Sequence, residues 1–464
     1  MKTLKLLIWT YFGLLLTEGA FRKWFLPGLS NPLLIVRDPV VLLIYLQAYR
    51  LGRFPGNVWF KAVAALSFCT LIGGILAEFV NPWVMAFGLR ADFLHIPLIF
   101  IMPEVFDETD VRRIGKAVLL LALPMALLMT MQFRAGPHDW INAGAGGGGQ
   151  ISSAMGKIRP AGTFSFISGP VFFYATVSAF LLAGLLARGS CPLWLLSAAG
   201  GATMLASVVS GSRSLLGSVA VVGLAMFVGV LLYPRAAVGS LRIAIVMGLL
   251  FIGVSSTRVF HEGQTVMAAR IENAAGGKDL STGIVRRFGY QFLVPEEVLF
   301  ETPLFGRGLG LGTNAGAGLI GIRNHFLLAE GEWARVVAET GVILGGLFLL
   351  LRILLTAFIL MSAVGTAREG RFMPLLLFGA GGLGLINGQW GQPTIQGFAT
   401  FLCGLSLAAM RRAPVTEVVC SPTVEESQGL KSFEPMPAPV DLFAEVRTIS
   451  RMDDPQPGRF AVRS

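Results

Sequence analysis

Apolar segments long enough to cross a lipid bilayer recur along almost the whole sequence. A membrane-spanning helix needs roughly 20 mainly apolar residues, because the hydrocarbon core is about 30 Å thick. We identify about twelve such segments, at residues 4–20, 33–49, 58–80, 84–103, 115–133, 166–187, 192–210, 214–233, 241–257, 336–363, 372–389 and 394–411. Backbone groups in lipid must be satisfied internally, which segments of this length achieve as helices. The sequence therefore predicts an all-α, polytopic transmembrane bundle.

Composition supports this class and argues against others. The chain is 54% hydrophobic and only 14% charged, which is far from the balance of a soluble globular domain. Its net charge of +10 comes from basic residues in short connections between apolar segments, so we expect membrane lipids and not nucleic acid as partners. The four cysteines occur singly, without metal-ligand spacing, and the external loops hold no acidic cluster of the DxD kind. We therefore expect no disulfide, metal or cofactor.

Lys and Arg in the short connections predict the orientation, because cytoplasmic loops are enriched in these residues. Basic residues fall on one side if the segments alternate, for example Lys2, Arg50, Arg112, Arg235 and Arg368. The first segment resembles a signal peptide, but Glu18 and the bulky run at residues 21–24 replace a cleavage site, so we expect it to remain. Both termini are predicted to be cytoplasmic.

The same alternation predicts the domain organisation. Residues 1–411 form the membrane domain, with external loops at 134–165 and 258–335, and the second, larger loop joins spans nine and ten. Residues 412–464 are polar, rich in proline and mixed in charge, so we expect a disordered cytoplasmic tail.

Several basic residues depart from the orientation rule. Arg22, Arg90 and Arg213 lie at or near external ends of predicted spans, and Arg159 lies in the first external loop. Charges at such positions are costly and commonly mark functional sites. Several basic groups on one face favour an anionic ligand there. The alternatives are arginines that reach the interface, or a local pair between Arg90 and Asp92 that only shapes the bundle.

Polar residues are densest at the end of the second external loop, which contributes Arg307, Arg323, His325, Glu330, Glu332 and Arg335. A helix that begins near Glu330 would place Glu332 and Arg335 on one face, with Glu339 four residues further on. Guanidinium groups are suited to a diphosphate, because they form forked hydrogen bonds and stay charged beside lipid. His325, Glu330 and Glu332 are candidate bases for removing a proton from an acceptor hydroxyl. The alternatives are a histidine that caps a turn and an ordinary helical ion pair.

Six short motifs carry a resemblance to a known family: EGAFRKWFLP at 18–27, GLRADFLHIPLIF at 88–100, RPAGTF at 159–164, SGSRS at 210–214, PLFGRGLG at 303–310 and EWARVVAETGVILGG at 332–346. On these motifs the chain resembles the O-antigen polymerase and O-antigen ligase superfamily, and more closely its exopolysaccharide-polymerase branch. In that superfamily the large external loop ends in a helix with a pattern like HNxxLxxxxExG. If Glu339 and Gly341 match its end, the family histidine falls on Glu330, and His325 lies five residues earlier.

The resemblance implies a glycosyltransferase in the inner membrane of a bacterium. It would polymerise undecaprenyl-diphosphate-linked repeat units at the outer leaflet, together with other proteins of polysaccharide assembly and export. A ligase that transfers a finished glycan, a transporter or flippase, and a scaffold of an export complex are the alternatives. The predicted catalytic residues are Glu332, Glu330, His325 and Arg335. The predicted diphosphate-binding residues are Arg213, Arg159, Arg307, Arg323, Arg90 and Arg22.

Overall fold

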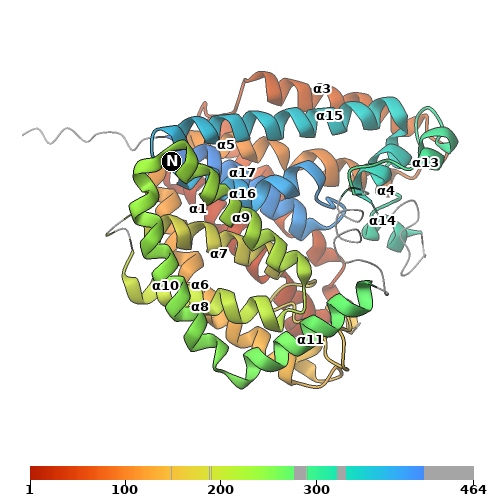
Figure 1. The fold of residues 1–464 in the computed structure, drawn as a ribbon. Helices are drawn as coiled ribbons and strands as arrows, with labels where there is room; N and C mark the ends of the chain where they lie inside the picture. The colour runs from red at the N-terminus through yellow and green to blue at the C-terminus, as the bar shows by residue number, and fades with distance from the viewer. Residues whose placement is uncertain are drawn as a thin grey trace, which may run out of the picture. The chain divides into compact units, whose positions relative to one another are not determined.

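The computed structural model describes residues 1–411 except Gly148, Arg188, Ser190, residues 276–288, Tyr290 and residues 321–330. Within this part of the chain, helix is the regular secondary structure, and pairing of extended backbone is limited to two isolated antiparallel bridges (Figure 1). The predicted all-α class is thereby confirmed. The predicted disordered tail lies outside the described residues.

Ten helical segments among the described residues are long and apolar enough to cross a membrane. They are built on α1 (Lys2–Ala20), α2 (Arg37–Arg50), α3 (Val58–Ile75), α4 (Pro82–Leu89) with α5 (Ile96–Val105), α6 (Glu108–Arg134), α7 (Ser168–Leu186), α9 (Arg213–Leu232), α10 (Ala237–Ser255), α15 (Glu332–Arg368) and α17 (Pro393–Met410). Two shorter apolar helices, α8 (Leu193–Val209) and α16 (Met373–Asn387), lie among them. The chain is thus a multi-pass membrane protein, and the count of about twelve spans stays a prediction.

The core forms around α16, which packs against α7, α9, α15 and α17. Small residues on α16 allow these close approaches, as in many membrane helix pairs. A Cβ atom added to Gly381 would lie 2.6 Å from the Cβ atom of Leu402, and one added to Gly384 would lie 2.8 Å from Phe172. The glycines therefore let side chains of α17 and α7 pack directly against the backbone of α16.

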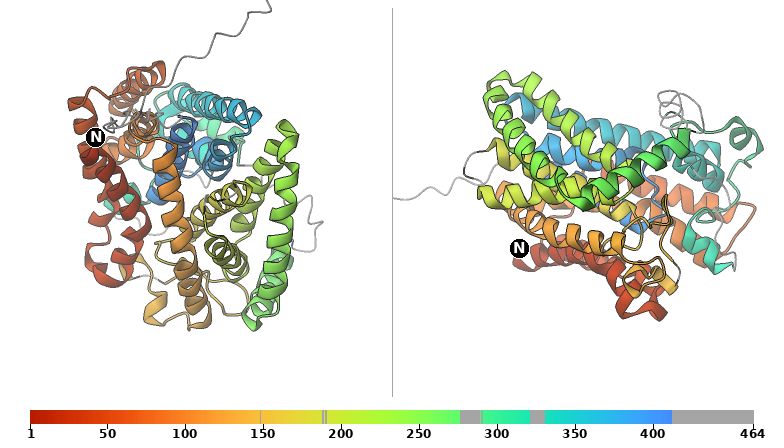
Figure 2. Two further views of the ribbon diagram at one scale, coloured as in Figure 1. Left: turned by 90° about the vertical axis from the view of Figure 1, so that its left-hand side faces the viewer. Right: turned by 60° about the horizontal axis from the view of Figure 1, so that its bottom comes forward.

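The bundle has two distinguishable ends. We call the first the terminal end, because Lys5 of α1 pairs there with Asp110, and Arg411 lies 3.1 Å from Glu104. We call the other the loop end, and it carries residues 135–167 and 302–313. Figure 1 shows α11 (Arg258–Ala275), α13 (Glu296–Glu301) and α14 (Asn314–Leu319) there, away from the N-terminus, and the right-hand view of Figure 2 agrees.

Two predicted segments differ from the structure. The predicted span at 84–103 is a helix interrupted by a wide turn at Arg90–Leu94, between α4 and α5. The predicted loop at 258–335 is partly helical, because α11 follows α10 almost directly and packs on α8. A Cβ atom added to Gly263 of α11 would lie 2.9 Å from Val208, so the two helices approach closely at this glycine.

Candidate functional site

The predicted helix near Glu330 begins at Glu332 in the structure, and Gly341 interrupts it. Gly341 has a φ of 84°, and a Cβ atom there would lie 2.0 Å from the carbonyl oxygen of Leu304. Because the helix is interrupted, the carbonyl groups of Ala338 and Glu339 can accept hydrogen bonds from another segment. The backbone N–H of Arg307 donates to Ala338 at 2.9 Å, and that of Gly308 donates to Glu339 at 3.3 Å. The PLFGRGLG motif is therefore bound to the helix by backbone hydrogen bonds.

The carboxylate of Glu339 adds to this contact between the glycine-rich segment and the helix, which we call the junction. It accepts hydrogen bonds from the backbone N–H groups of Gly310, at 3.0 Å, and Gly312, at 2.8 Å. Its side chain is fully buried. Glu339 therefore fixes the glycine-rich segment, and two motifs that are distant in sequence form one structural unit.

Glu332 and Arg335 belong to a buried ionic network at the same place. Arg335 Nε donates to Glu332 at 2.9 Å, its Nη2 donates to Asp92 at 2.9 Å, and its Nη1 lies 2.9 Å from Glu339. Arg352 donates to Glu332 Oε1 at 2.8 Å and to the carbonyl group of Leu385 at 2.8 Å. Three acidic and two basic side chains thus pair with one another, with one carboxyl group in excess.

This geometry argues against two predicted catalytic roles. Both carboxylate oxygens of Glu332 accept hydrogen bonds from arginines, and Oε1 also accepts one from the backbone N–H of Trp390 at 3.2 Å. A general base must be reached by the substrate, whereas the side chain of Glu332 is fully buried and paired with two arginines. Arg335 is equally occupied and only 5% of its side chain is exposed. We therefore interpret both residues as structural.

Three predicted diphosphate ligands also have protein partners. Arg90 pairs with Asp38 and donates to the carbonyl group of Leu34 at 2.9 Å, so the considered pair with Asp92 does not form. Arg22 donates to the carbonyl group of Ser30 at 2.8 Å. Arg307 is 43% exposed and lies 3.7 Å from Glu301. Arg90 and Arg22 are therefore held by the bundle, whereas Arg307 keeps an exposed guanidinium group.

The remaining candidates of the second loop, Arg323, His325 and Glu330, lie outside the described residues. Their predicted roles stay predictions.

Arg159 and Arg213 lie together at the loop end, with a third arginine that we did not predict, Arg270 of α11. We call these three residues the arginine cluster. A Cβ atom added to Gly211 of the SGSRS motif would lie 3.7 Å from Arg270 Nη1 and 2.9 Å from Ser153 Oγ. Arg213 follows two residues later as the first residue of α9. The motif therefore places Arg213 beside α11.

Local structure fixes each member of the cluster. Residues 151–159 form a small hairpin, in which the N–H of Arg159 donates to Ile151 at 2.9 Å. Lys157 of this hairpin lies 2.9 Å from Glu262, which ties the hairpin to α11. Gly211 has a φ of 55°, and the adjacent turn is closed by a hydrogen bond from the N–H of Ser212 to Ser210 Oγ at 3.2 Å. Three separate segments thus converge here.

The electrostatics of the cluster favour an anion. Among the described residues, none of the three guanidinium groups has a carboxylate partner, and Arg159 Nε, Arg270 Nη1 and Ser153 Oγ are buried without hydrogen-bond partners. Burial, then the charges of Arg159 and Arg213, lower the pKa of Arg270 to about 10. Burial and the charge of Arg213 lower the pKa of Arg159. Buried donors without partners are uncommon, because each costs about 1–3 kcal/mol.

The sequence offered unequal signals for the residues that we missed. Arg352 interrupts the apolar run LFLLLRILL, and an intramembrane charge of this kind is a recognisable signal. Arg270 lies in a mixed polar stretch without a motif. Only the packing of α11 on α8 brings Arg270 to the cluster.

Together, the fold and the cluster define a polytopic helical membrane protein with a cluster of cationic side chains at one end of the bundle. Within the described ranges, no group of three or more potential ligands could hold a metal ion. Neither the comparison with protein-family models nor the comparison with curated protein sequences gives a match.

Proposed function

We propose that the chain is a membrane glycosyltransferase that polymerises lipid-diphosphate-linked oligosaccharide repeat units into an exopolysaccharide or O-antigen. We place the reaction at the outer leaflet of the bacterial inner membrane. The observation that carries the proposal is the arginine cluster: three guanidinium groups, two of them with buried donors that lack partners, beside the first turn of an apolar helix. A diphosphate attached to a prenyl chain matches this combination of charge and lipid contact.

The cluster would act on the leaving group. The acceptor hydroxyl oxygen attacks the anomeric carbon of the donor sugar, and the bond from this carbon to the diphosphate oxygen breaks. The electron pair of that bond leaves with the diphosphate, where the fixed guanidinium charges stabilise the developing negative charge. The hydroxyl proton passes to a base. His325 and Glu330 remain the proposed bases, because the carboxylate of Glu332 is buried and paired with two arginines in the structure.

Two alternatives share parts of this arrangement. Transfer of a finished glycan to another acceptor would use the same diphosphate site and differ only in the acceptor. A transporter would place ionisable groups along a path near mid-membrane. The network around Arg335 does place charges among apolar helices, but its groups are buried and paired with one another. We therefore favour group transfer.

The test replaces each cluster arginine with alanine in cells that lack the native gene. Loss of one charge-assisted interaction should lower the rate of polymer formation by roughly 10- to 100-fold, with normal protein level in the membrane. Polymer amount and chain length on gels report the effect. Purified R159A, R213A and R270A should also bind decaprenyl diphosphate more weakly by a similar factor.

Arg258→Ala is the matched control, because Arg258 lies on α11 with Arg270 but is exposed at the start of the helix. It should leave polymer and binding within twofold of the unchanged protein. Normal polymer from all three cluster variants would contradict the proposal. Weak diphosphate binding and loss of polymer in R270A would support the proposal, provided that R258A binds diphosphate and makes polymer normally.

A further inference from the structure

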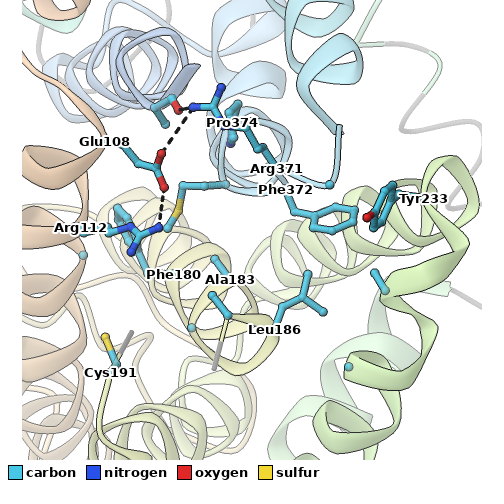
Figure 3. Close-up of a pocket in the computed structure, with 18 of the residues that line it drawn as sticks. Glu108, Arg112, Phe180, Ala183, Leu186, Cys191, Tyr233, Arg371, Phe372 and Pro374 are labelled. Atoms are coloured by element: carbon cyan, nitrogen blue, oxygen red, sulfur yellow. Dashed lines mark hydrogen bonds and ion pairs between the residues drawn. The ribbon is translucent and has the colours of Figure 1, made fainter. Parts of the chain in front are cut away.

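A cavity of about 490 Å³ opens at the terminal end of the bundle (Figure 3). The arginine cluster lies at the other end, the loop end. Its walls come from the first turns of α6, the end of α7, the start of α10 and the segment that joins α15 to α16. All of these segments meet at the end where Lys5 pairs with Asp110. The cavity therefore lies where lipid headgroups meet the protein.

One side of the cavity is apolar. Phe180 and Leu186 of α7 and Val238 of α10 line it. Tyr233 and Phe372 close it, with ring centroids 6.3 Å apart, and Figure 3 shows the two rings beside each other. Its apolar lining is suited to contact with the acyl chain of a lipid.

The other side of the cavity is basic. Four cationic side chains line it, Arg112, Lys116, Arg235 and Arg371, against a single carboxylate, Glu108. Glu108 is already shared, since its oxygens lie 2.6 Å from Arg112 and 3.5 Å from Arg371.

Arg371 also donates to the carbonyl groups of Ala409, at 2.8 Å, and Met410, at 3.0 Å, and so caps α17. Lys116 and Arg235 are exposed and, within the described ranges, have no carboxylate partner. An excess of positive charge therefore faces the cavity from two different helical segments.

We propose that this cavity binds one anionic phospholipid. The phosphate lies between Lys116 and Arg235, and an acyl chain follows the apolar side formed by α7 and α10. Basic pockets between membrane helices recognise lipid headgroups by this combination of charge and apolar surface. A soluble phosphate would use only the basic side and would leave the apolar side without an occupant. The inference does not depend on the proposed function.

The lipid would have a structural effect on α10. None of the described side chains of α10 is buried within the bundle, so its contacts with the other helices are shallow. The phospholipid fills the space between α10 and α7 and adds contact area. Because α11 follows α10 after a short turn, the lipid also stabilises the helix that carries Arg270.

The test compares the purified full-length chain with the double variant K116A/R235A by native mass spectrometry in detergent micelles. Phosphatidylglycerol and phosphatidylcholine are the probes. The unchanged chain should retain one phosphatidylglycerol molecule in preference to phosphatidylcholine, and K116A/R235A should bind phosphatidylglycerol roughly 10- to 30-fold more weakly. Lys116→Arg with Arg235→Lys keeps both charges and should restore the preference.

The control is R50A/K61A, which removes two exposed basic residues that do not line the cavity. It should bind phosphatidylglycerol as the unchanged chain does. An equal loss in both double variants would mean that general surface charge attracts the lipid, and would overturn the proposal. Full displacement of phosphatidylglycerol by an equal concentration of inorganic phosphate would also overturn it, because the site would then recognise a soluble anion.

Discussion

Glu332 shows how burial decides the role of a charged residue. It accepts hydrogen bonds from two buried arginines, so Glu332→Ala removes the carboxylate partner of Arg352, whereas Arg335 keeps Asp92 and Glu339. Removing one partner of a buried ionic pair costs about 3–5 kcal/mol. We expect E332A to lower the thermal unfolding temperature in detergent strongly and to reduce the yield of folded protein.

Glu297→Ala is the control for this change, because Glu297 is exposed on α13. Its effect on the free energy of unfolding should stay within about 0.5 kcal/mol. Glu332→Gln separates the two possible roles of the residue. Loss of polymer formation by E332Q with an unchanged unfolding temperature would indicate a catalytic base and contradict the structural role.

Single residues were predicted from sequence where a motif marked them. The SGSRS and RPAGTF motifs identified Arg213 and Arg159, which the structure brings to one cluster. Spacing also predicted the contacts of Arg335 with Glu332 and Glu339 along the helix. Asp92 as the third partner could not be predicted, because it lies 243 residues away and depends on how α15 packs beside the turn after α4.

At the scale of elements, Gly341 divides α15 and creates the junction with the glycine-rich segment. Gly341→Ala combines a positive φ with a Cβ atom only 2.0 Å from a carbonyl oxygen. We expect it to cost at least about 3 kcal/mol of stability, since the strain and the clash add. Thermal unfolding of the purified protein measures this loss.

Gly346→Ala provides the matched comparison on the same helix. No atom lies within 4 Å of a Cβ atom added there, and its backbone is helical. Alanine should therefore leave stability unchanged or raise it by up to about 1 kcal/mol. Equal effects of the two substitutions would show that the junction does not stabilise the protein.

Apolar length predicted most elements, because the bilayer fixes the length of a spanning helix. Apolar length alone does not predict where a helix is interrupted or where a loop becomes helical. The break at Gly341 depends on hydrogen bonds from Arg307 and Gly308, and α11 depends on packing against α8. Neither contact leaves a signal in hydrophobicity alone.

At the scale of the whole molecule, the structure places the start of α1 and the end of α17 at one end of the bundle. We expect this end to face the cytoplasm, because basic residues are concentrated in its connections. Single cysteines in a background without the native four test the orientation. His138→Cys at the loop end should react with an impermeant thiol reagent in intact cells, whereas Arg50→Cys should react only after permeabilisation. The reverse pattern would place the arginine cluster in the cytoplasm and exclude the proposed reaction.

The buried network has a consequence for biogenesis. Asp92 enters the membrane with an early segment, but its partner Arg335 is synthesised 243 residues later. At the usual pace of translation, about 5–20 residues per second, this delay lasts roughly 12–50 s. During that interval the carboxyl group of Asp92 has no Arg335 to neutralise it. The membrane domain therefore cannot reach its final packing until the ribosome has delivered the last third of the chain.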